Sequence, residues 1–198
     1  MYKKIILLFI CSLLALNAQA QGFKGGGQIG ILATQVDGDN HSGYKKAGLF
    51  AGIFTNYSFA NEKIQLQFEI NYAQKGSRAA PIYRMRLHQV EPTAMFRWYF
   101  WEKNLFLETG LSFNILAASK EYYYDELLVT ENTKSKFYRF NVEWVGGIGY
   151  CFHEHWGGGL RFTYSSPIGT TNKMNSKVGG VKGYMCNNCL QFRVFYQF

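Results

Sequence analysis

The most constraining feature of this chain is a two-residue alternation of apolar and polar side chains that recurs in five segments. Successive side chains of a β-strand point to opposite faces, so this period predicts strands with one apolar and one polar face. The clearest segment, residues 64–73, sets Ile, Leu, Phe, Ile and Tyr against Gln, Gln, Glu, Asn and Ala. The others are residues 90–100, 105–115, 138–151 and 190–198, and weaker segments near residues 23–35, 47–60 and 156–165 bring the expected number of strands to eight.

The connections between these segments alternate in length. Residues 61–63, 101–104 and 153–155 form short connections, whereas residues 36–46, 76–84, 119–136 and 167–184 form long ones. Each segment reaches the roughly 9 to 11 residues that a tilted strand needs to cross a bilayer. The pattern predicts an all-β fold, an eight-stranded antiparallel up-and-down transmembrane β-barrel, with both termini and the short turns in the periplasm.

The N-terminus has the features of a cleavable leader. Lys3 and Lys4 precede an apolar run over residues 5–16, and Ala18-Gln19-Ala20 follows. We therefore expect residues 1–20 to be a secretory signal peptide, residues 21–198 to be one barrel domain, and the mature protein to reach the cell outer membrane. Twelve apolar residues fall short of the roughly 20 of a membrane helix, and Ile10 before Cys11 argues against a lipid anchor.

The polar parity of the strands carries charges of both signs. Its acids and bases are Glu69, Glu91, Glu108 and Glu143, and Arg97, Arg139, Arg161 and Arg193. Because an eight-stranded barrel is just wide enough for side chains to fill it, we expect these groups to form a polar structural core that leaves no continuous pore. A catalytic or proton-conducting array is the alternative, functional interpretation of these charges, and we favour the structural one.

Two other interpretations stay open at this point. A soluble, lipocalin-like barrel would turn its apolar parity inward around a small apolar ligand, although the scarcity of lysine on the polar parity argues against it. A lipid-modifying barrel would need a Ser, His and acid in a recognisable arrangement, and the sequence offers none. We therefore expect no enzyme activity and no cofactor.

The net charge of +8 falls to +6 once the two leader lysines are removed, and the surplus lies in or beside the long loops. Such a basic rim suits the phosphates of lipopolysaccharide, with Lys45, Lys46, Arg84 and Arg86 as the candidate contacts. Ordinary solvated loops explain the charge equally well. Nucleic acid is not expected as a partner, because no nucleic-acid-binding motif accompanies the charge.

Cysteine, histidine and glycine residues have modest expected roles. Cys186 and Cys189, at the foot of the fourth long loop, are candidates for a local disulfide after export. His153 and His155 flank Glu154 in a predicted turn without further visible ligands, so we expect no metal site. The glycine groups at residues 25–27, 146–149 and 157–159 fit bends of a small barrel better than phosphate-binding loops.

Aromatic residues make up 18% of the chain and gather near both predicted membrane interfaces, as in the girdles of membrane barrels. The periplasmic set is Tyr57, Phe59, Trp98, Phe100, Trp101, Phe152, Trp156, Tyr196 and Phe198, and the outer set is Tyr72, Tyr83, Phe137, Tyr138 and Tyr164. We expect a monomeric outer-membrane barrel with a structural or surface-interaction role.

Three stretches also carry a family resemblance. The stretch Lys46-Ala47-Gly48-Leu49-Phe50-Ala51-Gly52, followed by residues 66–76 (LQFEINYAQKG) and by Val90-Glu91-Pro92-Thr93-Ala94, resembles the PorT-type outer-membrane β-barrel family of Bacteroidetes. The resemblance implies an eight-stranded barrel similar to OmpX and OmpA. It also implies that the terminal Phe198 is similar to the aromatic end used by the barrel-assembly machinery. One member of that family is associated with secretion, and nothing in these motifs transfers that role.

Overall fold

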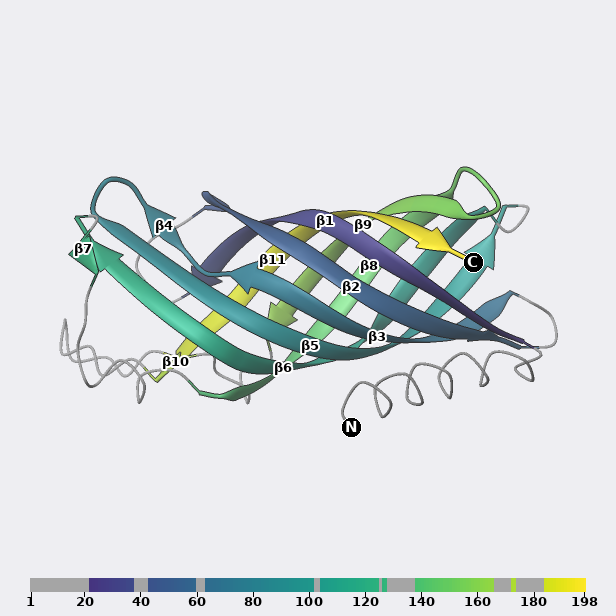
Figure 1. Ribbon diagram of the computed structural model, residues 1–198, viewed down its shortest axis with the longest axis horizontal. Helices are drawn as coiled ribbons and strands as arrows, with labels where there is room; N and C mark the ends of the chain where they lie inside the picture. The colour runs from purple at the N-terminus through teal and green to yellow at the C-terminus, as the bar shows by residue number, and fades with distance from the viewer. Residues whose placement is uncertain are drawn as a thin grey trace, which may run out of the picture.

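The structure, a computed structural model, describes residues 22–37, 43–59, 63–101, 104–124, 126–127, 138–165, 172–173 and 184–198 (Figure 1). The predicted leader, residues 1–20, and the predicted start of the mature chain at Gln21 lie outside these residues. In the part of the chain that is described, no helix is long and apolar enough to cross a membrane.

The described residues form eight long strands and three strands of two residues. The long strands are β1 (Phe23–Asp37), β2 (Lys46–Ser58), β3 (Ile64–Lys75), β5 (Tyr83–Phe100), β6 (Leu105–Tyr123), β8 (Phe140–Cys151), β9 (Trp156–Ser165) and β11 (Tyr184–Gln197). The short ones are β4 (Arg78–Ala79), β7 (Glu126–Leu127) and β10 (Asn172–Lys173).

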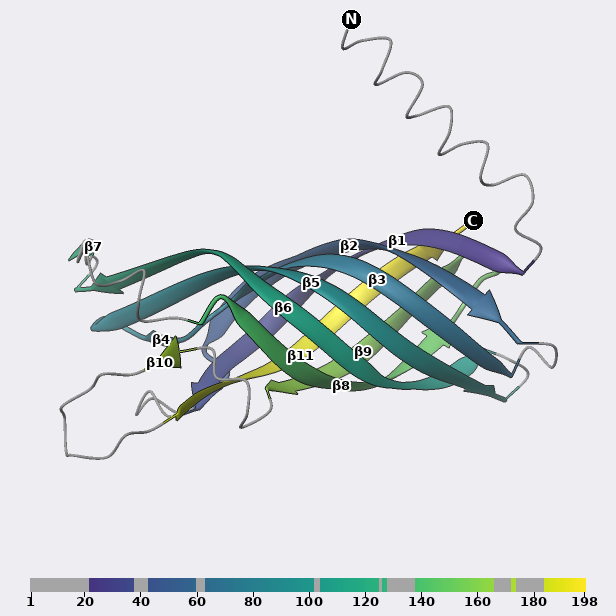
Figure 2. The same ribbon diagram turned by 90° about the horizontal axis from the view of Figure 1, so that it is seen from below.

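The long strands close into an antiparallel barrel. Each pairs with the next long strand along the chain, and β1 pairs with β11 from Gly26↔Gln197 to Asp37↔Cys186. Figures 1 and 2 show the strands tilted against the long axis of the barrel, as closure requires. The predicted eight-stranded up-and-down barrel is confirmed.

The two ends of the barrel differ as predicted. The turn between β8 and β9 and the end of the chain lie at one end, at the right in Figure 1, which we call the short-turn end. The other end, which we call the long-loop end, carries β4, β7 and β10 (Figure 1). There β4 pairs with β5 and β7 pairs with β6, so both extend the barrel wall beyond its rim.

The alternation places apolar side chains outside and polar side chains inside. Along β3, Phe68 and Ile70 are about half exposed, whereas Gln67, Glu69 and Asn71 are buried. The same holds along β5, where Phe96 and Trp98 face outward and Arg97 is fully buried. The lipocalin-like alternative is therefore wrong, because its apolar parity would have to face inward.

One irregularity interrupts the wall. Pro92 lies inside β5, where a bulge would be expected because proline cannot donate to the ladder. The register with β3 instead runs evenly through Ile70↔Pro92, and the β5–β6 register shifts between His88 and Gln89. The bulge therefore lies closer to the long-loop end, where β5 and β6 begin to extend past their neighbours.

Candidate functional site

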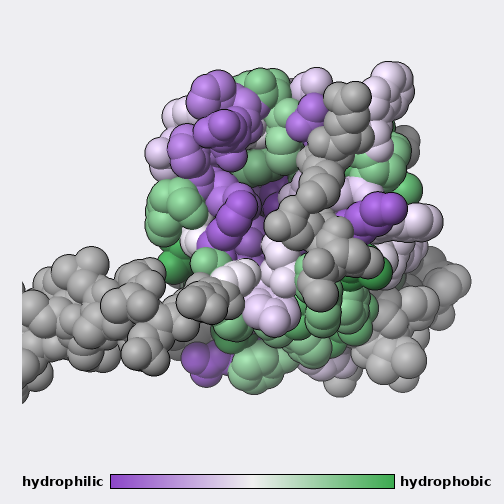
Figure 3. Space-filling view, turned by 90° about the vertical axis from the view of Figure 1, so that its right-hand side faces the viewer, coloured by the Kyte–Doolittle hydropathy of each residue, from purple (hydrophilic) through white to green (hydrophobic). Residues whose placement is uncertain are grey.

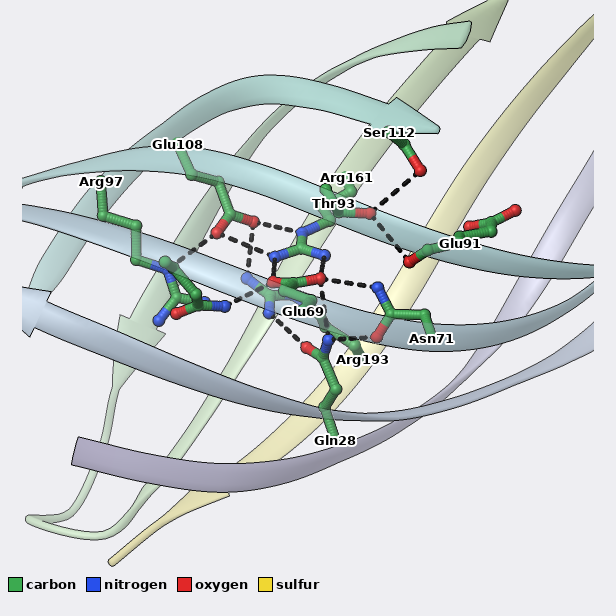
Figure 4. Close-up of polar contacts among 11 residues, drawn as sticks. Gln28, Glu69, Asn71, Glu91, Thr93, Arg97, Glu108, Ser112, Arg161 and Arg193 are labelled. Carbon is green, nitrogen blue, oxygen red and sulfur yellow. Dashed lines mark hydrogen bonds and ion pairs between the residues drawn. The ribbon is translucent and has the colours of Figure 1, made fainter. Parts of the chain in front are cut away.

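The interior is held by a central cluster of two glutamates and three arginines from five strands (Figure 4). Glu108 accepts from Arg161 Nε at 2.6 Å, from a terminal amino group of Arg193 at 2.5 Å and from Arg97 Nε at 3.0 Å. Glu69 accepts from both terminal amino groups of Arg161, at 2.8 and 2.6 Å. The Arg161 guanidinium thus bridges both carboxylates, which suits its planar set of donors.

Neutral polar side chains add hydrogen bonds to the glutamates and to Arg193 of this cluster. Gln28 donates to Glu69 at 2.9 Å and to the Asn71 side-chain oxygen at 2.8 Å, while its own oxygen accepts from Arg193 at 2.7 Å. Asn71 and Gln67 also donate to Glu69. A buried charge is costly unless it is paired and hydrogen-bonded, so these contacts are needed for the cluster to be stable.

Gly147 makes room for the cluster, and Gly30 lets the neighbouring strand approach closely. A Cβ on Gly147 would lie 2.9 Å from Arg161 Cγ and 3.1 Å from a Glu108 carboxylate oxygen. A Cβ on Gly30 would lie 2.1 Å from the backbone carbonyl oxygen of Phe192 on β11. These close approaches explain glycine inside strands, where it otherwise weakens the ladder, and agree with the prediction that strand glycines help a small barrel to close.

A second ion cluster lies nearer the long-loop end. Lys75 Nζ lies 2.5 Å from a Glu143 carboxylate oxygen and 2.7 Å from one of Glu91, and all three side chains are buried. The Asn187 amide donates to Glu143 at 3.3 Å. Lys75 was not predicted here, because its place beside a long loop suggested a surface charge. Lys75 and Glu69 lie an even number of residues apart on β3, so their side chains face the same side of the strand. This shared parity is the sequence signal that would have predicted Lys75 inside the barrel.

Apolar layers separate the clusters from both ends. Along β5, the inward residues run from Met85 and Leu87 through Glu91 to Arg97 and Tyr99. Met85 and Leu87 pack with Val36 in an apolar cluster at the long-loop end. At the short-turn end, Tyr99 belongs to an aromatic layer that also contains Phe54, Phe106 and Phe195.

Arg97 links the central cluster to the aromatic layer. Its guanidinium carbon lies 4.5 Å from the ring centroid of Phe106 and 5.3 Å from that of Phe195. A cation over an aromatic face is attracted to it, more so when both are shielded from water. The interior is therefore a packed series of charged and apolar layers.

Arg139 is not part of the interior, contrary to the prediction. It precedes β8, which begins at Phe140, and its side chain is exposed. The other seven predicted residues, Glu69, Glu91, Arg97, Glu108, Glu143, Arg161 and Arg193, are all buried inside the barrel. With Lys75 in the place of Arg139, the two clusters still hold four basic and four acidic groups.

The candidate contacts to lipopolysaccharide do not all face outward. Lys45 is exposed and Arg84 and Arg86 are partly exposed. Lys46 is buried and its Nζ donates to the Gln74 carbonyl oxygen at 3.3 Å, so its selection was wrong. Lys46 has the parity of the inward-facing Phe50, which is why it turns into the barrel.

Cys186 and Cys189 are not joined in a disulfide. Both lie in β11, and residues three apart in an extended strand point to opposite faces. Cys189 is buried inside the barrel and Cys186 has the opposite parity. The local disulfide was predicted because the segment was taken for the foot of a loop.

At the short-turn end, a cavity of about 590 Å³ lies beyond the aromatic layer. Its lining includes Lys24, Gln65, Tyr99, His155 and Gln197. Figure 3 looks onto this end and shows hydrophilic residues around a hollow, with hydrophobic residues toward the outside. Tyr99 and Phe195 belong both to this lining and to the aromatic layer, so that layer separates the cavity from the central cluster.

The predicted aromatic girdles are exposed at every described position but one. All nine residues of the short-turn set are exposed, with Trp101 and Phe198 more than two-thirds exposed. In the set at the long-loop end, Tyr72, Tyr138 and Tyr164 are exposed, while Phe137 lies outside the described residues. Tyr83 was wrongly predicted there, because it has the parity of the inward-facing Met85 and packs against the interior cluster of Val36, Met85 and Leu87. An apolar band between two aromatic rings is the outer surface of a membrane barrel.

Comparison with known proteins agrees with this architecture. Residues 17–165 match a family described as "Outer membrane protein beta-barrel domain". Among solved structures, the chain is similar to Neisserial surface protein A, with a TM-score of 0.59 and 14% identity over 90% of this chain and 100% of that one. It is also similar to Ail, the attachment invasion locus protein of Yersinia pestis, with a TM-score of 0.53 and 12% identity over 89% and 99% of the two chains. No curated protein sequence matches.

Proposed function

Because this chain belongs to the outer membrane protein beta-barrel domain family and is located in the outer membrane, we propose that it serves there as a sealed barrel with a structural or surface-interaction role. In this proposal the long-loop end faces outward and the short-turn end faces the periplasm. The protein is neither a pore nor an enzyme.

The packed interior is the observation that carries the proposal. Arg161 joins Glu69 and Glu108 across the barrel, and Lys75 joins Glu91 and Glu143 in the same way. A conducting barrel needs a water-filled lumen, whereas these side chains are buried and in contact. The specificity of the protein would then lie in the wall and loops at the long-loop end.

The proposal includes three further features of the protein. It is a monomer, its close relatives within the family are of the PorT type, and the barrel-assembly machinery recognises Phe198 as its C-terminal signal. The exposure of the Phe198 ring supports the last of these, because a partner can reach it.

The test combines gel mobility with conductance. The protein from outer-membrane fractions should migrate differently with and without boiling, because a closed barrel resists detergent until it is heated. Reconstituted in planar bilayers, the same material should give no steady current under an applied voltage. Stable single-channel steps from heat-shiftable protein would overturn the sealed interior, and the absence of any heat shift would overturn the barrel in the membrane.

A further inference from the structure

A strip of basic side chains lies on the outer face of the wall where β4, β5 and β6 extend past the rest of the barrel. Arg78 on β4 lies directly opposite Arg84 on β5, and Arg86 on β5 lies directly opposite Lys120 on β6. These positions have the opposite parity to the inward-facing Met85. The strip therefore faces the surroundings of the barrel.

Tyr122 belongs to the same face and holds two of these cations close together. The guanidinium carbon of Arg84 lies 4.8 Å from its ring centroid, and that of Arg86 lies 5.8 Å from it. Contacts of this kind orient the planar guanidinium groups. Their fork of donors is suited to a phosphate group.

Like charges in directly opposed cross-strand pairs destabilise a sheet. This wall contains such a pair in Arg86 and Lys120. An anion bound between the strands would remove this cost. The arrangement therefore disfavours a wall surrounded by water alone and favours one in contact with a layer of negative charge.

The height of the strip matches the headgroup layer of the membrane. On β5 the outward side chains from Phe100 to Val90 belong to the apolar band. At about 3.3 Å per residue along a strand tilted by about 45°, this part of β5 spans a height of roughly 25 Å. That is the height expected for the lipid-facing band of such a barrel. Arg86 lies four residues before Val90 in the chain and so about 10 Å nearer the long-loop end, where the headgroups meet water.

We propose that Arg78, Arg84, Arg86 and Lys120 bind the phosphate groups of outer-leaflet lipopolysaccharide, with Tyr122 as the platform that orients the two central arginines. The proposal rests on the proposed orientation of the barrel, with its long-loop end outward. It assigns the lipid contact to one wall of the barrel, and Lys46, which faces the interior, has no part in it.

The test uses the full mature chain and the double variant Arg86→Gln/Lys120→Gln, which removes one opposed pair. The control, Lys45→Gln/Arg139→Gln, removes two exposed charges at the same end of the barrel that do not lie on β4, β5 or β6. Lys45 is thus no longer a proposed lipid contact. Unfolding midpoints are measured in phosphatidylcholine vesicles alone, with lipid A that carries both phosphates, with lipid A stripped of phosphate, and with inorganic phosphate.

Phosphorylated lipid A should raise the midpoint of the wild type and the control, and most of this rise should be lost in the strip variant. In phosphatidylcholine alone, the strip variant should be at least as stable as the wild type, because the repulsion within the pair is gone. Equal rises in the strip variant and the wild type would overturn the proposal. So would an equal rise with stripped lipid A or with inorganic phosphate, or an equal loss of the rise in the control.

The boiled and unboiled mobilities are recorded for the same samples. A heat shift in every sample without the lipid A effect would overturn only the phosphate site. Loss of the heat shift in the wild type would instead overturn the proposed function on which the site depends.

Discussion

Glu108 is the side chain whose loss should matter most to this barrel. It accepts from Arg97, Arg161 and Arg193, at distances of 2.5 to 3.2 Å. The substitution Glu108→Gln keeps the size of the side chain and leaves no cavity. It removes the negative charge and leaves three guanidinium groups facing Glu69 as the remaining acid of the central cluster.

The expected cost follows from the burial of these groups. Removing one partner of a buried ion pair typically costs about 3–5 kcal/mol, because the other charge stays buried without compensation. The Glu108 side chain is fully buried and so are those of its three partners, so the upper part of that range applies. At a guanidinium sensitivity of roughly 4 kcal/mol per molar, the unfolding midpoint should fall by about 1 M.

The assay is guanidinium unfolding of protein folded into lipid vesicles, followed by the gel mobility of the closed barrel. Glu154→Gln is the matched control, because it makes the same chemical change on an exposed turn and should stay within about 0.5 kcal/mol of the wild type. The double variant Glu108→Gln/Arg193→Met removes one of the uncompensated cations. It should therefore be more stable than Glu108→Gln alone.

Two results would refute this reasoning. One is a midpoint for Glu108→Gln that coincides with that of Glu154→Gln, which would mean that the cluster holds little of the stability. The other concerns the double variant Glu108→Gln/Arg193→Met. Its loss of unfolding free energy should be smaller than the sum of the losses in Glu108→Gln and in Arg193→Met, because residues that stabilise one another show coupling, so an equal or larger loss would refute the reasoning.

Three further predictions concern other parts of the wall and interior. Gly30→Val should sharply lower the refolding yield, because a Cβ there collides with a backbone carbonyl oxygen of β11. Gly27→Ala should refold normally, because its Cβ would meet its nearest neighbour only at 3.9 Å. Densitometry of the folded band on a gel measures both yields. Lys75→Met should lower the free energy of unfolding by about 3–5 kcal/mol, because Glu143 loses its buried cation, and the guanidinium assay checks this. Removing Phe198 should lower the amount of barrel assembled in cells while leaving refolding of the purified chain unchanged, as quantified by heat-shiftable protein in each case.

The sequence alone predicted the eight long strands and, for a barrel in a membrane, which face of each strand lies inside. A period of two has only two phases, and the charges of a membrane barrel can be buried only in its interior, so the alternation of residues 64–73 placed Glu69 correctly. The same reasoning placed Arg97 and Arg161, although nothing in the sequence showed that both contact Glu108. Those contacts depend on the register of strands that are distant in the chain.

Predictions failed at the ends of strands. Lys46 and Lys75 were assigned to loops, and Arg139 to a strand, because a segment boundary read from the sequence is uncertain by a few residues. The pair Cys186 and Cys189 was placed at the foot of a loop for the same reason. A residue joins the interior only if its strand continues to that point, and strand length depends on the neighbours available for pairing.

The sequence by itself therefore determined that the chain consists of strands with one apolar and one polar face, since this follows from local alternation. That the polar faces lie inside a closed barrel was favoured by the sequence and decided by the structure. The tertiary structure alone decided that Lys75 takes the place expected for Arg139, and that Arg86 and Lys120 lie opposite one another on one wall. These are pairings between side chains of different strands. They follow from closure, register and the bulge between His88 and Gln89, which no local pattern encodes.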